Sequence, residues 1–395
     1  MKEIIDITLK SGKEQSVYRR HPWIFSGAIK QFSDKVTEGQ LVRILDNNGR
    51  FLAKGHYQVG SIAIKIVSFD DIDIDYNFWK ERIFSAFRLR QIAGITDKPD
   101  TNVYRLINAE GDNLPGLIVD LYNGTAVTQF HSVGMYLIKD QILLALQEIF
   151  GKKIKAVYDK SEGTMPFKGP IKPVNGYLWG TNETDTVIEN GNQFIVDWTE
   201  GQKTGFFIDQ RENRKLVQEY AHSRQMLNLF CYTGSFSIYA LKGGASLVHS
   251  VDSSKSAIDL AEKNIKLNFK NNTNHEVFVS DAFDFLANIK DMYDLIILDP
   301  PAFAKHNKAL DNALQGYKHL NQKAFEQIKK GGLLFTFSCS QVVSKENFRK
   351  SVFVAAANSR RKVSILHQLT QPADHPINIY HPEGEYLKGL VLLVE

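Results

Sequence analysis

Residues 226–252 read MLNLFCYTGSFSIYALKGGASLVHSVD, and this stretch decides the fold. It alternates between a predicted strand at 226–230, a helix that runs through residue 238 and a second strand at 247–251. Further strands are predicted at 276–279, 295–298, 332–337, 363–366 and 390–394, with a helix at 254–267. Such βα repeats predict a doubly wound α/β fold, in which seven mostly parallel strands form one sheet and ligands bind beyond the carboxyl ends of the strands.

The chain has 395 residues. Several domains are expected, because a single hydrophobic core stops growing at roughly 250 to 300 residues. Residues 1–70 show short alternating strands separated by turns, which predicts a small β domain. Residues 71–185 combine strands with predicted helices at 78–95 and near 137–150, which indicates an α+β middle domain. Residues 186–395 hold the βα repeats, and a predicted hairpin at 186–198 bridges the last two domains.

The composition is that of a globular protein, with 43% hydrophobic and 23% charged residues, and the net charge is +4. Residues 1–70 contain eleven Lys and Arg against seven Asp and Glu, so the basic surplus lies there and suits contact with a polyanion. No apolar run approaches the roughly 18 residues of a membrane span, and residues 1–6 do not fit a secretory signal, so we expect a cytosolic protein. The two cysteines are too few for a disulfide scaffold, and no cluster of metal-ligand type is evident.

The loop after the first strand has the composition of a cofactor site. Gly234 lets the backbone pass close to a ligand, but the full Gly-x-Gly-x-x-Gly of a dinucleotide site is missing, which favours a cofactor without phosphates. Asp252 ends the second strand about 20 residues later, where a carboxylate accepts from both ribose hydroxyls. The alternative is an exposed acid at a helix start, where Ser253 or Ser254 is an equally good cap. Asp281, after the third strand, suits either an adenine amino group or the cap of the next helix.

The most informative string is Asp299-Pro300-Pro301-Ala302-Phe303, directly after the fourth strand. Two prolines stop a strand abruptly and stiffen its exit. We expect them to hold Asp299 where a nucleobase presents its edge, with Phe303 available for stacking. The alternative is a structural turn, although such a turn rarely needs an acid, two prolines and an aromatic side chain together.

Cys339 follows the fifth strand, so one of the two thiols is expected at the same edge of the sheet as Asp299. Cytosine C5 is a poor nucleophile, and a thiolate that adds to C6 makes C5 enamine-like, so covalent catalysis replaces one difficult step by two easier ones. Asp299 is suited to accept a hydrogen bond from the cytosine amino group. The alternative is a buried cysteine that packs as a small hydrophobe, and this interpretation is favoured for Cys231.

Together these strings resemble the class I methyltransferases that depend on S-adenosylmethionine (SAM). They are most similar to the bacterial ribosomal RNA large-subunit methyltransferase I family, which forms 5-methylcytosine in 23S rRNA, over nearly the whole chain. Residues 19–27 resemble the start of the family's PUA domain, an RNA-binding β-barrel, with core packing of Trp23 and Phe25 as the alternative. Residues 201–211 resemble the family's segment before the cofactor domain, and Asp209 is placed there to cap a helix at 211–220.

The resemblance implies a Rossmann-like class I methyltransferase domain, preceded by a PUA-like β-barrel and the α+β middle domain. It implies a homodimer that acts on 23S rRNA, with Cys339 attacking C6 and Asp299 binding the base as the catalytic residues. The family often has Ser or Asp where this chain has Cys231, so the role of that position stays open. The expected cofactor-binding residues are Gln210, Phe230, Tyr232, Thr233, Gly234, Asp252, Ser253, Asp281, Ala282 and Asp299. The expected RNA-binding residues are Arg20, Trp23, Pro300, Pro301 and Phe303.

Three other functions compete with this interpretation. Guanine-N methyltransferases share the loop and the Asp-Pro-Pro-x-Phe string but lack a thiol at the position of Cys339, so that residue separates carbon from nitrogen methylation. A nicotinamide-dependent oxidoreductase would share Asp252 and the βα repeats, but the phosphate-binding glycines are missing. A non-catalytic RNA-binding protein would not need Asp252, Asp299 and Cys339 together.

Overall fold

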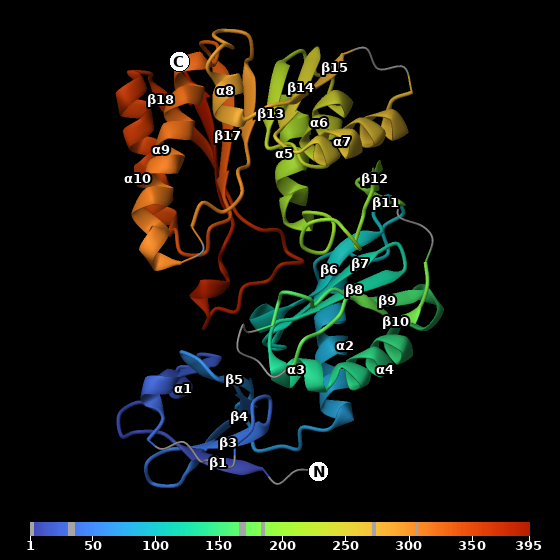
Figure 1. Cartoon of the computed structure of the whole chain (residues 1–395), viewed down its shortest axis with the longest axis vertical. Helices are drawn as coiled ribbons and strands as arrows, with labels where there is room; N and C mark the ends of the chain where they lie inside the picture. Colours follow the sequence, from blue (N-terminus) through green and yellow to red (C-terminus); the bar gives the residue numbers. More distant parts are fainter. Residues whose placement is uncertain (1–3, 31–35, 166–170, 183–185, 271–273, 305) are drawn as a thin grey trace. The chain divides into compact units, whose positions relative to one another are not determined.

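The computed structural model describes residues 4–30, 36–165, 171–182, 186–270, 274–304 and 306–395, and the chain forms two compact units (Figure 1). Unit 1 contains Met1–Val187, Val196–Ile208 and Ala373–Gly384, and unit 2 contains Ile188–Ile195, Asp209–Pro372 and Glu385–Glu395. Residues 1–3, used in the argument against a secretory signal, and 183–185, at a predicted domain boundary, lie outside the described residues. The predicted division into residues 1–70, 71–185 and 186–395 stays a prediction.

Unit 2 is built on a seven-stranded sheet in the order β15-β14-β13-β16-β17-β19-β18. The first five strands of this order run parallel, and β19 is antiparallel to both β17 and β18. The predicted Rossmann-like, mostly parallel sheet is therefore confirmed. The strands are β13 (Gln225–Leu229), β14 (Leu247–Asp252), β15 (His275–Val279), β16 (Leu295–Leu298), β17 (Gly332–Ser338), β18 (Val363–Leu369) and β19 (Lys388–Val394).

The strand register brings the carboxyl ends of the parallel strands to one rim. Leu229 pairs with Val251 of β14 and with Leu298 of β16, and Leu298 pairs with Thr336 of β17. The residues that follow these positions leave the sheet together, because parallel strands in register end at the same edge. This rim, which we call the C-terminal rim, therefore collects the loops that carry the predicted site.

Helices cover both faces of this sheet, and successive strand residues alternate between two cores. Leu227 and Ile296 pack with α9 side chains on one face, whereas Met226 and Leu295 pack with α5 and α6 side chains on the other. The helices are α5 (Arg211–Tyr220), α6 (Ser235–Lys242), α7 (Lys255–Asn268), α8 (Ala282–Leu286), α9 (Leu310–Gln327) and α10 (Lys345–Ser359).

Unit 1 contains two five-stranded sheets, in the orders β1-β3-β4-β5-β2 and β10-β9-β8-β7-β6. Their strands are β1 (Ile5–Thr8), β2 (Trp23–Phe25), β3 (Leu41–Leu45), β4 (Phe51–Tyr57), β5 (Ile62–Ser68), β6 (Val103–Asn108), β7 (Leu117–Tyr122), β8 (Thr125–Phe130), β9 (Ala156–Asp159) and β10 (Gly176–Gly180). The helices are α1 (Gln15–Tyr18), α2 (Tyr76–Ile92), α3 (Val133–Leu137) and α4 (Lys139–Phe150). Residues of α2 and α4 pack on the second sheet in one hydrophobic core.

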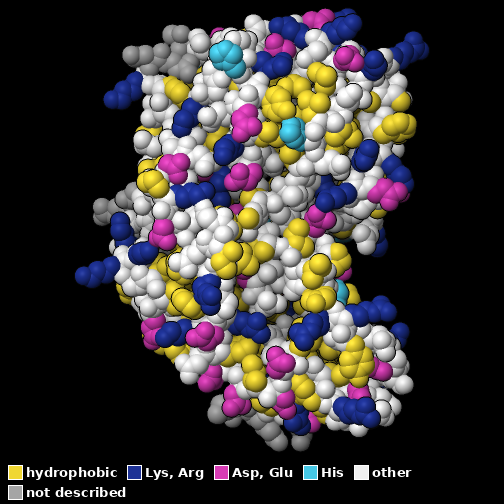
Figure 2. All heavy atoms as spheres, turned by 180° about the vertical axis from the view of Figure 1, so that it is seen from behind, with side chains coloured by type: hydrophobic (Ala, Val, Ile, Leu, Met, Phe, Trp, Pro, Cys, Tyr) yellow, Lys and Arg dark blue, Asp and Glu magenta, His cyan; other side chains and the backbone are white. Residues whose placement is uncertain are grey.

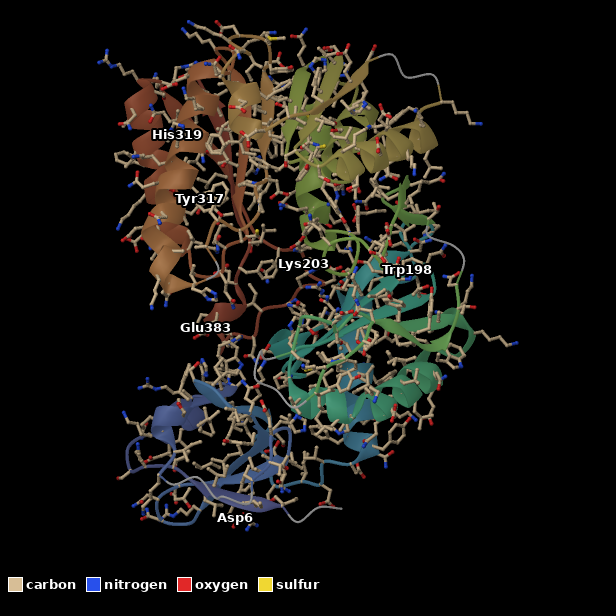
Figure 3. The ribbon with its side chains drawn as sticks, in the orientation of Figure 1. Asp6, Trp198, Lys203, Tyr317, His319 and Glu383 are labelled. Carbon is tan, nitrogen blue, oxygen red and sulfur yellow. The ribbon has the colours of Figure 1, made fainter. Side chains whose placement is uncertain are left out.

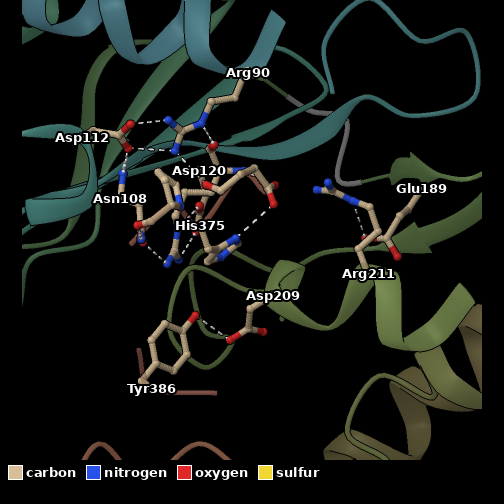
Figure 4. Close-up of polar contacts among 12 residues, drawn as sticks. Arg90, Asn108, Asp112, Asp120, Glu189, Asp209, Arg211, His375 and Tyr386 are labelled. Carbon is tan, nitrogen blue, oxygen red and sulfur yellow. Dashed lines mark hydrogen bonds and ion pairs between the residues drawn. The ribbon is translucent and has the colours of Figure 1, made fainter. Parts of the chain in front are cut away.

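A buried ionic network holds the Ala373–Gly384 segment in unit 1 (Figure 4). The Arg90 guanidinium forms a two-pronged ion pair with Asp112 and donates to the backbone carbonyl of Asp374 at 2.7 Å. The Asp374 carboxylate in turn accepts from the backbone N–H of Arg105. The segment that connects β18 and β19 in sequence is thus tied to unit 1 by charged, hydrogen-bonded groups.

Several predicted elements differ from the observed ones. The helix predicted near 137–150 is α4, which begins at Lys139, and the short helix α3 before it was not predicted. The helix predicted at 78–95 begins at Tyr76 and ends at Ile92. The predicted hairpin consists of β11 (Thr186–Glu189) and β12 (Asn192–Ile195). Residues 188–195 of this hairpin belong to unit 2, and residues 186 and 187 belong to unit 1. Helices α9 and α10 were not predicted, since polar residues interrupt their apolar stripes.

No helix in the described ranges is both long and apolar enough to cross a bilayer. On the face seen in Figure 2, Lys and Arg side chains are interspersed with Asp and Glu. This mixture agrees with the small net charge of +4 and does not form a surface of one sign on that face.

Candidate active site

The loop between β13 and α6 holds a strained backbone. Phe230 and Tyr232 have positive φ angles of 58° and 45°, and Gly234 has a φ of 72°. Non-glycine residues adopt this left-handed conformation rarely, and they keep it only where the surroundings enforce it. Backbone hydrogen bonds do so here, since the Cys231 N–H donates to the Val251 carbonyl and the Gly234 N–H donates to the Cys231 carbonyl. We call residues 230–234 the donor loop.

Asp252 is held in place by two backbone amides at the C-terminal rim. Its Oδ2 accepts from the Tyr232 N–H at 3.0 Å, and its Oδ1 accepts from the Ser254 N–H at 2.9 Å. The cap of α7 is Ser254, whose hydroxyl accepts from the Ala257 N–H, so Asp252 does not serve as that cap. Each carboxylate oxygen keeps a second lone pair that is available to a ligand hydroxyl.

Asp281 caps α8, which was the structural alternative for this residue. Its Oδ1 accepts from the backbone N–H groups of Phe283 and Asp284, at 2.8 and 3.2 Å. Asp281 is exposed, and the neighbouring Ala282 is buried. Capping occupies one oxygen, so the predicted contact with an adenine amino group would use the other and stays a prediction.

Asp299 leaves β16 at the centre of the rim and contacts Gln210. The Gln210 side-chain amide donates to Asp299 Oδ2 at 3.0 Å and accepts from the Asn213 amide at 2.6 Å. Burial raises the pKa of Asp299 to about 7, and the nearby charge of Asp209 acts in the same direction. The structure therefore joins two of the predicted site residues, Gln210 and Asp299, through a hydrogen bond.

Asp209 does not cap α5, contrary to the sequence-based expectation. A short 3-10 turn, Ile208–Gln210, runs directly into α5, so Gln210 takes the cap position and Asp209 precedes it. Asp209 Oδ2 accepts from the Tyr386 hydroxyl at 2.8 Å (Figure 4). Asp209 Oδ1 is buried and has no hydrogen-bond partner among the described residues. A buried carboxylate oxygen without a donor is suited to receive one from a ligand.

Cys339 lies just beyond β17, beside the Asp-Pro-Pro loop. Its sulfur is 3.9 Å from the Pro300 carbonyl oxygen, and the side chain is half-buried against the apolar cluster on the α5 and α6 face. Cys231 is buried against Ile258 and Ala261 instead, and burial raises the pKa of its thiol. The two thiols therefore have different surroundings, and Cys339 is the one next to the loop that carries Asp299.

The prolines and Phe303 shape the exit of β16. Pro300 is buried and Pro301 is exposed. Phe303 is half-buried, and its ring centroid lies 4.7 Å from that of Tyr317 on α9, the residue labelled in Figure 3. One face of the Phe303 ring is thus engaged by protein, so stacking on a base would need the remaining exposed part.

The predicted RNA contacts Arg20 and Trp23 lie in unit 1. The indole N–H of Trp23 donates to Glu110 at 2.8 Å, and its ring lies 4.3 Å from the His381 ring. Arg20 is exposed, with its guanidinium 5.5 Å from the Phe69 ring centroid. Trp23 is therefore held by partners of its own unit, whereas the Arg20 charge faces solvent.

Sequence reasoning missed Lys388, the first residue of β19. Its side chain is buried, with 3% exposure, and its ammonium donates to the Ser340 carbonyl at 2.6 Å. Burial lowers the pKa of Lys388 to about 8. A lysine that opens an otherwise apolar strand was the available signal, but the predicted strand began at residue 390 and left Lys388 out.

The doubly wound sheet, the donor loop and the acid that ends β14 define a SAM-dependent methyltransferase. The S-adenosylmethionine-dependent methyltransferase family model matches residues 173–377, and the PUA-like domain model matches residues 7–69. Ribosomal RNA large subunit methyltransferase I of Tolumonas auensis is 39% identical over 394 residues, which cover 98% of each chain. The Escherichia coli protein of that name is 36% identical over 397 residues, or 99% of each chain. The chain belongs to the ribosomal RNA large subunit methyltransferase I family, so the predicted family is confirmed and the protein is a SAM-dependent rRNA methyltransferase.

Solved structures agree on the fold. A chain described as a SAM-dependent methyltransferase from Streptococcus mutans is 23% identical and has a TM-score of 0.85, covering 99% of this chain and 100% of that one. The methyltransferase SMU.776, in complex with SAH, is 24% identical with a TM-score of 0.86 and the same coverage. At this level of identity the likeness concerns the fold, which extends over the whole chain.

The rim has the chemistry that SAM requires. SAM is positively charged at its sulfonium and its ammonium and carries two ribose hydroxyls. The unpartnered Asp209 oxygen suits a cationic N–H donor, and the fixed Asp252 carboxylate suits hydroxyl donors. The residues present therefore fit the cofactor.

Proposed function

We propose that this enzyme methylates C5 of a cytosine in 23S rRNA through a covalent bond between the Cys339 sulfur and C6 of the base. The contact between the Cys339 sulfur and the Pro300 carbonyl carries the proposal, because it brings a nucleophile beside the loop of Asp299. A thiol and an acid at one rim are the groups needed to attack a pyrimidine and to hold its edge. Guanine-N methylation, the alternative, gives no role to a thiol at this position.

The proposed reaction begins with attack of the Cys339 thiolate on C6, which breaks the C5–C6 double bond and makes C5 nucleophilic. SAM supplies the methyl group that C5 takes up. A base then removes the C5 proton, the C6–S bond breaks, and the ring double bond and the thiolate are restored. The protein thus carries the substrate through two moderate barriers in place of one high barrier.

Asp299 is proposed to bind the cytosine edge in both of its protonation states. Because burial raises its pKa to about 7, the carboxyl is partly protonated at neutral pH. The protonated form donates to N3, which withdraws electrons from the ring and favours attack at C6, and the ionised form accepts from the amino group. The hydrogen bond from Gln210 fixes the orientation of the carboxyl group.

SAM is proposed to bind across the donor loop. Asp252, fixed by the Tyr232 and Ser254 amides, would hold the ribose hydroxyls, and the unpartnered oxygen of Asp209 would receive the ammonium. The other proposed cofactor contacts are Gln210, Phe230, Thr233, Gly234, Ser253, Asp281, Ala282 and Asp299.

The substrate RNA is proposed to contact Arg20 and Trp23 in unit 1 and Pro300, Pro301 and Phe303 in unit 2. The exposed Arg20 guanidinium supports a phosphate contact, since phosphate contacts position RNA without reading its sequence. The sequence resemblance is the support for 23S rRNA as the target and for a homodimer. The cytoplasmic location is proposed from the sequence pattern, in which no apolar run approaches a membrane span and residues 1–6 do not fit a secretory signal.

Substitution of Cys339 by alanine tests the proposal. We expect turnover on unmodified rRNA to be lost while SAM affinity, measured by calorimetry, stays within about fivefold of the wild-type value, because the thiol acts on the base alone. RNA that carries 5-fluorocytosine should form a lasting covalent adduct with the wild-type enzyme, since the C5 fluorine cannot leave as a proton. Peptide mass spectrometry should place this adduct on Cys339 and not on Cys231. Methyl transfer by the alanine variant would contradict C5 chemistry and favour nitrogen methylation.

A further inference from the structure

The strand pairing places Lys388 against the residues that surround Cys339. Strands β17 and β19 are antiparallel, with Lys388 directly opposite Ser338, the last residue of β17. The Lys388 ammonium reaches past this pair to the carbonyl oxygen of Ser340, at 2.6 Å. Lys388 therefore contacts the backbone on both sides of Cys339, and its position follows from the sheet register.

The Lys388 ammonium is buried, and its hydrogen bonds among the described residues do not include an anion that would balance its charge. Among the described residues, its hydrogen-bond partner is the Ser340 carbonyl, which is a neutral dipole. Removal of an ammonium from water is unfavourable unless an opposite charge lies close by. A buried lysine with a carbonyl as its hydrogen-bond acceptor therefore calls for a nearby anion.

Besides burial, three neighbouring charges act on Lys388: the sulfur of Cys339, when ionised, and the Glu385 carboxylate favour its charged form, while Lys345 opposes it. Glu385 is ion-paired with Lys345, and both side chains are partly exposed to solvent, which weakens their net effect on Lys388. Cys339 remains as the anion that a buried cation would stabilise. Burial lowers the pKa of Lys388 to about 8, so the ammonium is still mainly protonated at neutral pH.

Three other described groups lie near the Cys339 sulfur, and these three carry no positive charge. Tyr317 from α9 shares a hydrogen bond with the Ser340 hydroxyl, at 3.1 Å. The Pro300 carbonyl presents its oxygen to the sulfur, and Asp299, the residue before it, is an acid. All three would disfavour a thiolate or leave it unaffected, whereas the Lys388 charge would favour it.

We propose that Lys388 is a positioning residue that keeps Cys339 as a thiolate by placing a buried ammonium beside it. In this step the S–H bond breaks and its proton passes to solvent, while Lys388 retains its own proton and stabilises the sulfur anion through charge. The inference about the thiol rests on the contacts above. Its catalytic consequence rests on the proposed function, in which the thiolate attacks C6.

Alkylation of the full-length protein by iodoacetamide tests the inference without RNA or SAM. The rate is followed over a range of pH, and peptide mass spectrometry reads Cys339 and Cys231 separately. We compare the wild type with K388M, which keeps the length but removes the charge, and with K388R, which keeps the charge. K345M removes an exposed cation of the same neighbourhood and serves as the matched control. Cys231, at 5% exposure, becomes reactive only if a variant unfolds.

The alkylation midpoint is the pH at which Cys339 reacts at half of its maximal rate. We expect this midpoint to rise by about 1 to 2 pH units in K388M. K388R should stay within about 0.5 pH units of the wild type, and K345M within about 0.3, because solvent screens its charge. Under the proposed function, the pH profile of kcat should shift to higher pH in K388M, with KM nearly unchanged.

An unshifted Cys339 midpoint in K388M, with Cys231 still protected, would overturn the inference. If Cys231 becomes reactive in K388M, that variant is unfolded and K388R is used in its place. A Cys339 midpoint raised by about 1 pH unit or more in K388R, which keeps the charge, would overturn the inference. A shifted midpoint combined with an active Cys339→Ala enzyme would leave the Lys388 inference standing and contradict the proposed function. The two failures are therefore distinguishable.

Discussion

At the scale of single residues, Asp299 shows how surroundings set a chemical role. Burial raises its pKa to about 7, the Asp209 charge adds to that effect, and the hydrogen bond from Gln210 acts against it. A carboxyl that titrates near the working pH exchanges protons with small driving forces in both directions, which suits a group that holds a base edge during a change in ring charge. Its type and position were predicted from sequence, but its pKa depends on neighbours remote in sequence.

The Asp299→Asn variant tests this pKa through stability. The folded-state pKa of Asp299 is raised above 3.8, the ordinary value for an aspartate, so the stabilisation from the neutral carboxyl is fully present below pH 3.8 and is lost as pH rises through about 7. The amide does not titrate. The free energy of unfolding of the Asp299→Asn variant, minus that of the wild type, should therefore increase by about 1 to 3 kcal/mol between pH 5 and pH 8. Urea unfolding at both pH values measures the difference, and an equal difference at the two pH values would show an unshifted carboxyl.

At the scale of elements, the donor loop depends on close packing between neighbouring helices. A Cβ added at Gly234 would lie 3.0 Å from the Ala261 Cβ of α7, and the φ of Gly234 is 72°. Glycine is required there for both reasons, because it tolerates the left-handed conformation and leaves room for α7. The sequence pattern predicted both the glycine turn and the helix at 254–267, but not that the turn packs against that helix.

Gly234→Ala is expected to lower the free energy of unfolding by about 1 to 2 kcal/mol, and to weaken SAM binding several-fold by moving the donor loop. Gly331→Ala is the matched control, because Gly331 has a φ of 78° but no atom within 4 Å of its added Cβ. The control should show the conformational strain alone and normal SAM affinity. Urea unfolding and calorimetry measure the two effects. Equal SAM affinity in both variants would remove Gly234 from the proposed cofactor site.

Element prediction succeeded where one periodic pattern dominated. The strand β16 was predicted with its observed ends, since a continuous apolar run bounded by turns defines a buried strand. The start of β19 at Lys388 was missed, because a charged residue does not suggest a buried strand position. That position becomes acceptable only through the pairing with β17 and the Ser340 carbonyl.

At the scale of the whole molecule, the chain returns to unit 1 twice after entering unit 2, at Val196–Ile208 and Ala373–Gly384. The second return is held by the Arg90 network, and both Arg90 and Asp112 are almost completely buried. A buried ion pair of this kind contributes little relative to an apolar pair, but loss of one partner leaves an uncompensated charge.

Asp112→Ala is therefore expected to destabilise the protein by about 3 to 5 kcal/mol, and addition of Arg90→Met should recover part of that loss. The exposed pair of Asp6 and Arg43 provides the control, with 42% exposure of each side chain. Asp6→Ala should change the free energy of unfolding by less than about 1 kcal/mol. Chemical unfolding of the single and double variants gives these values. An Asp112→Ala loss no larger than the Asp6→Ala loss would contradict the role of the buried pair.

The sequence by itself determined the class of fold, the family, and the presence of Asp252, Asp299 and Cys339 at strand ends, because periodicity and strand-ending residues are local properties of a chain. Only the tertiary structure decided that Gln210 bonds to Asp299 and that Lys388 bonds to the carbonyl of Ser340, the residue after Cys339. These pairs are separated by 89 and about 50 residues, and their contact depends on the order and register of the strands between them. No short-range pattern encodes that register, since it is set by the packing of the whole sheet.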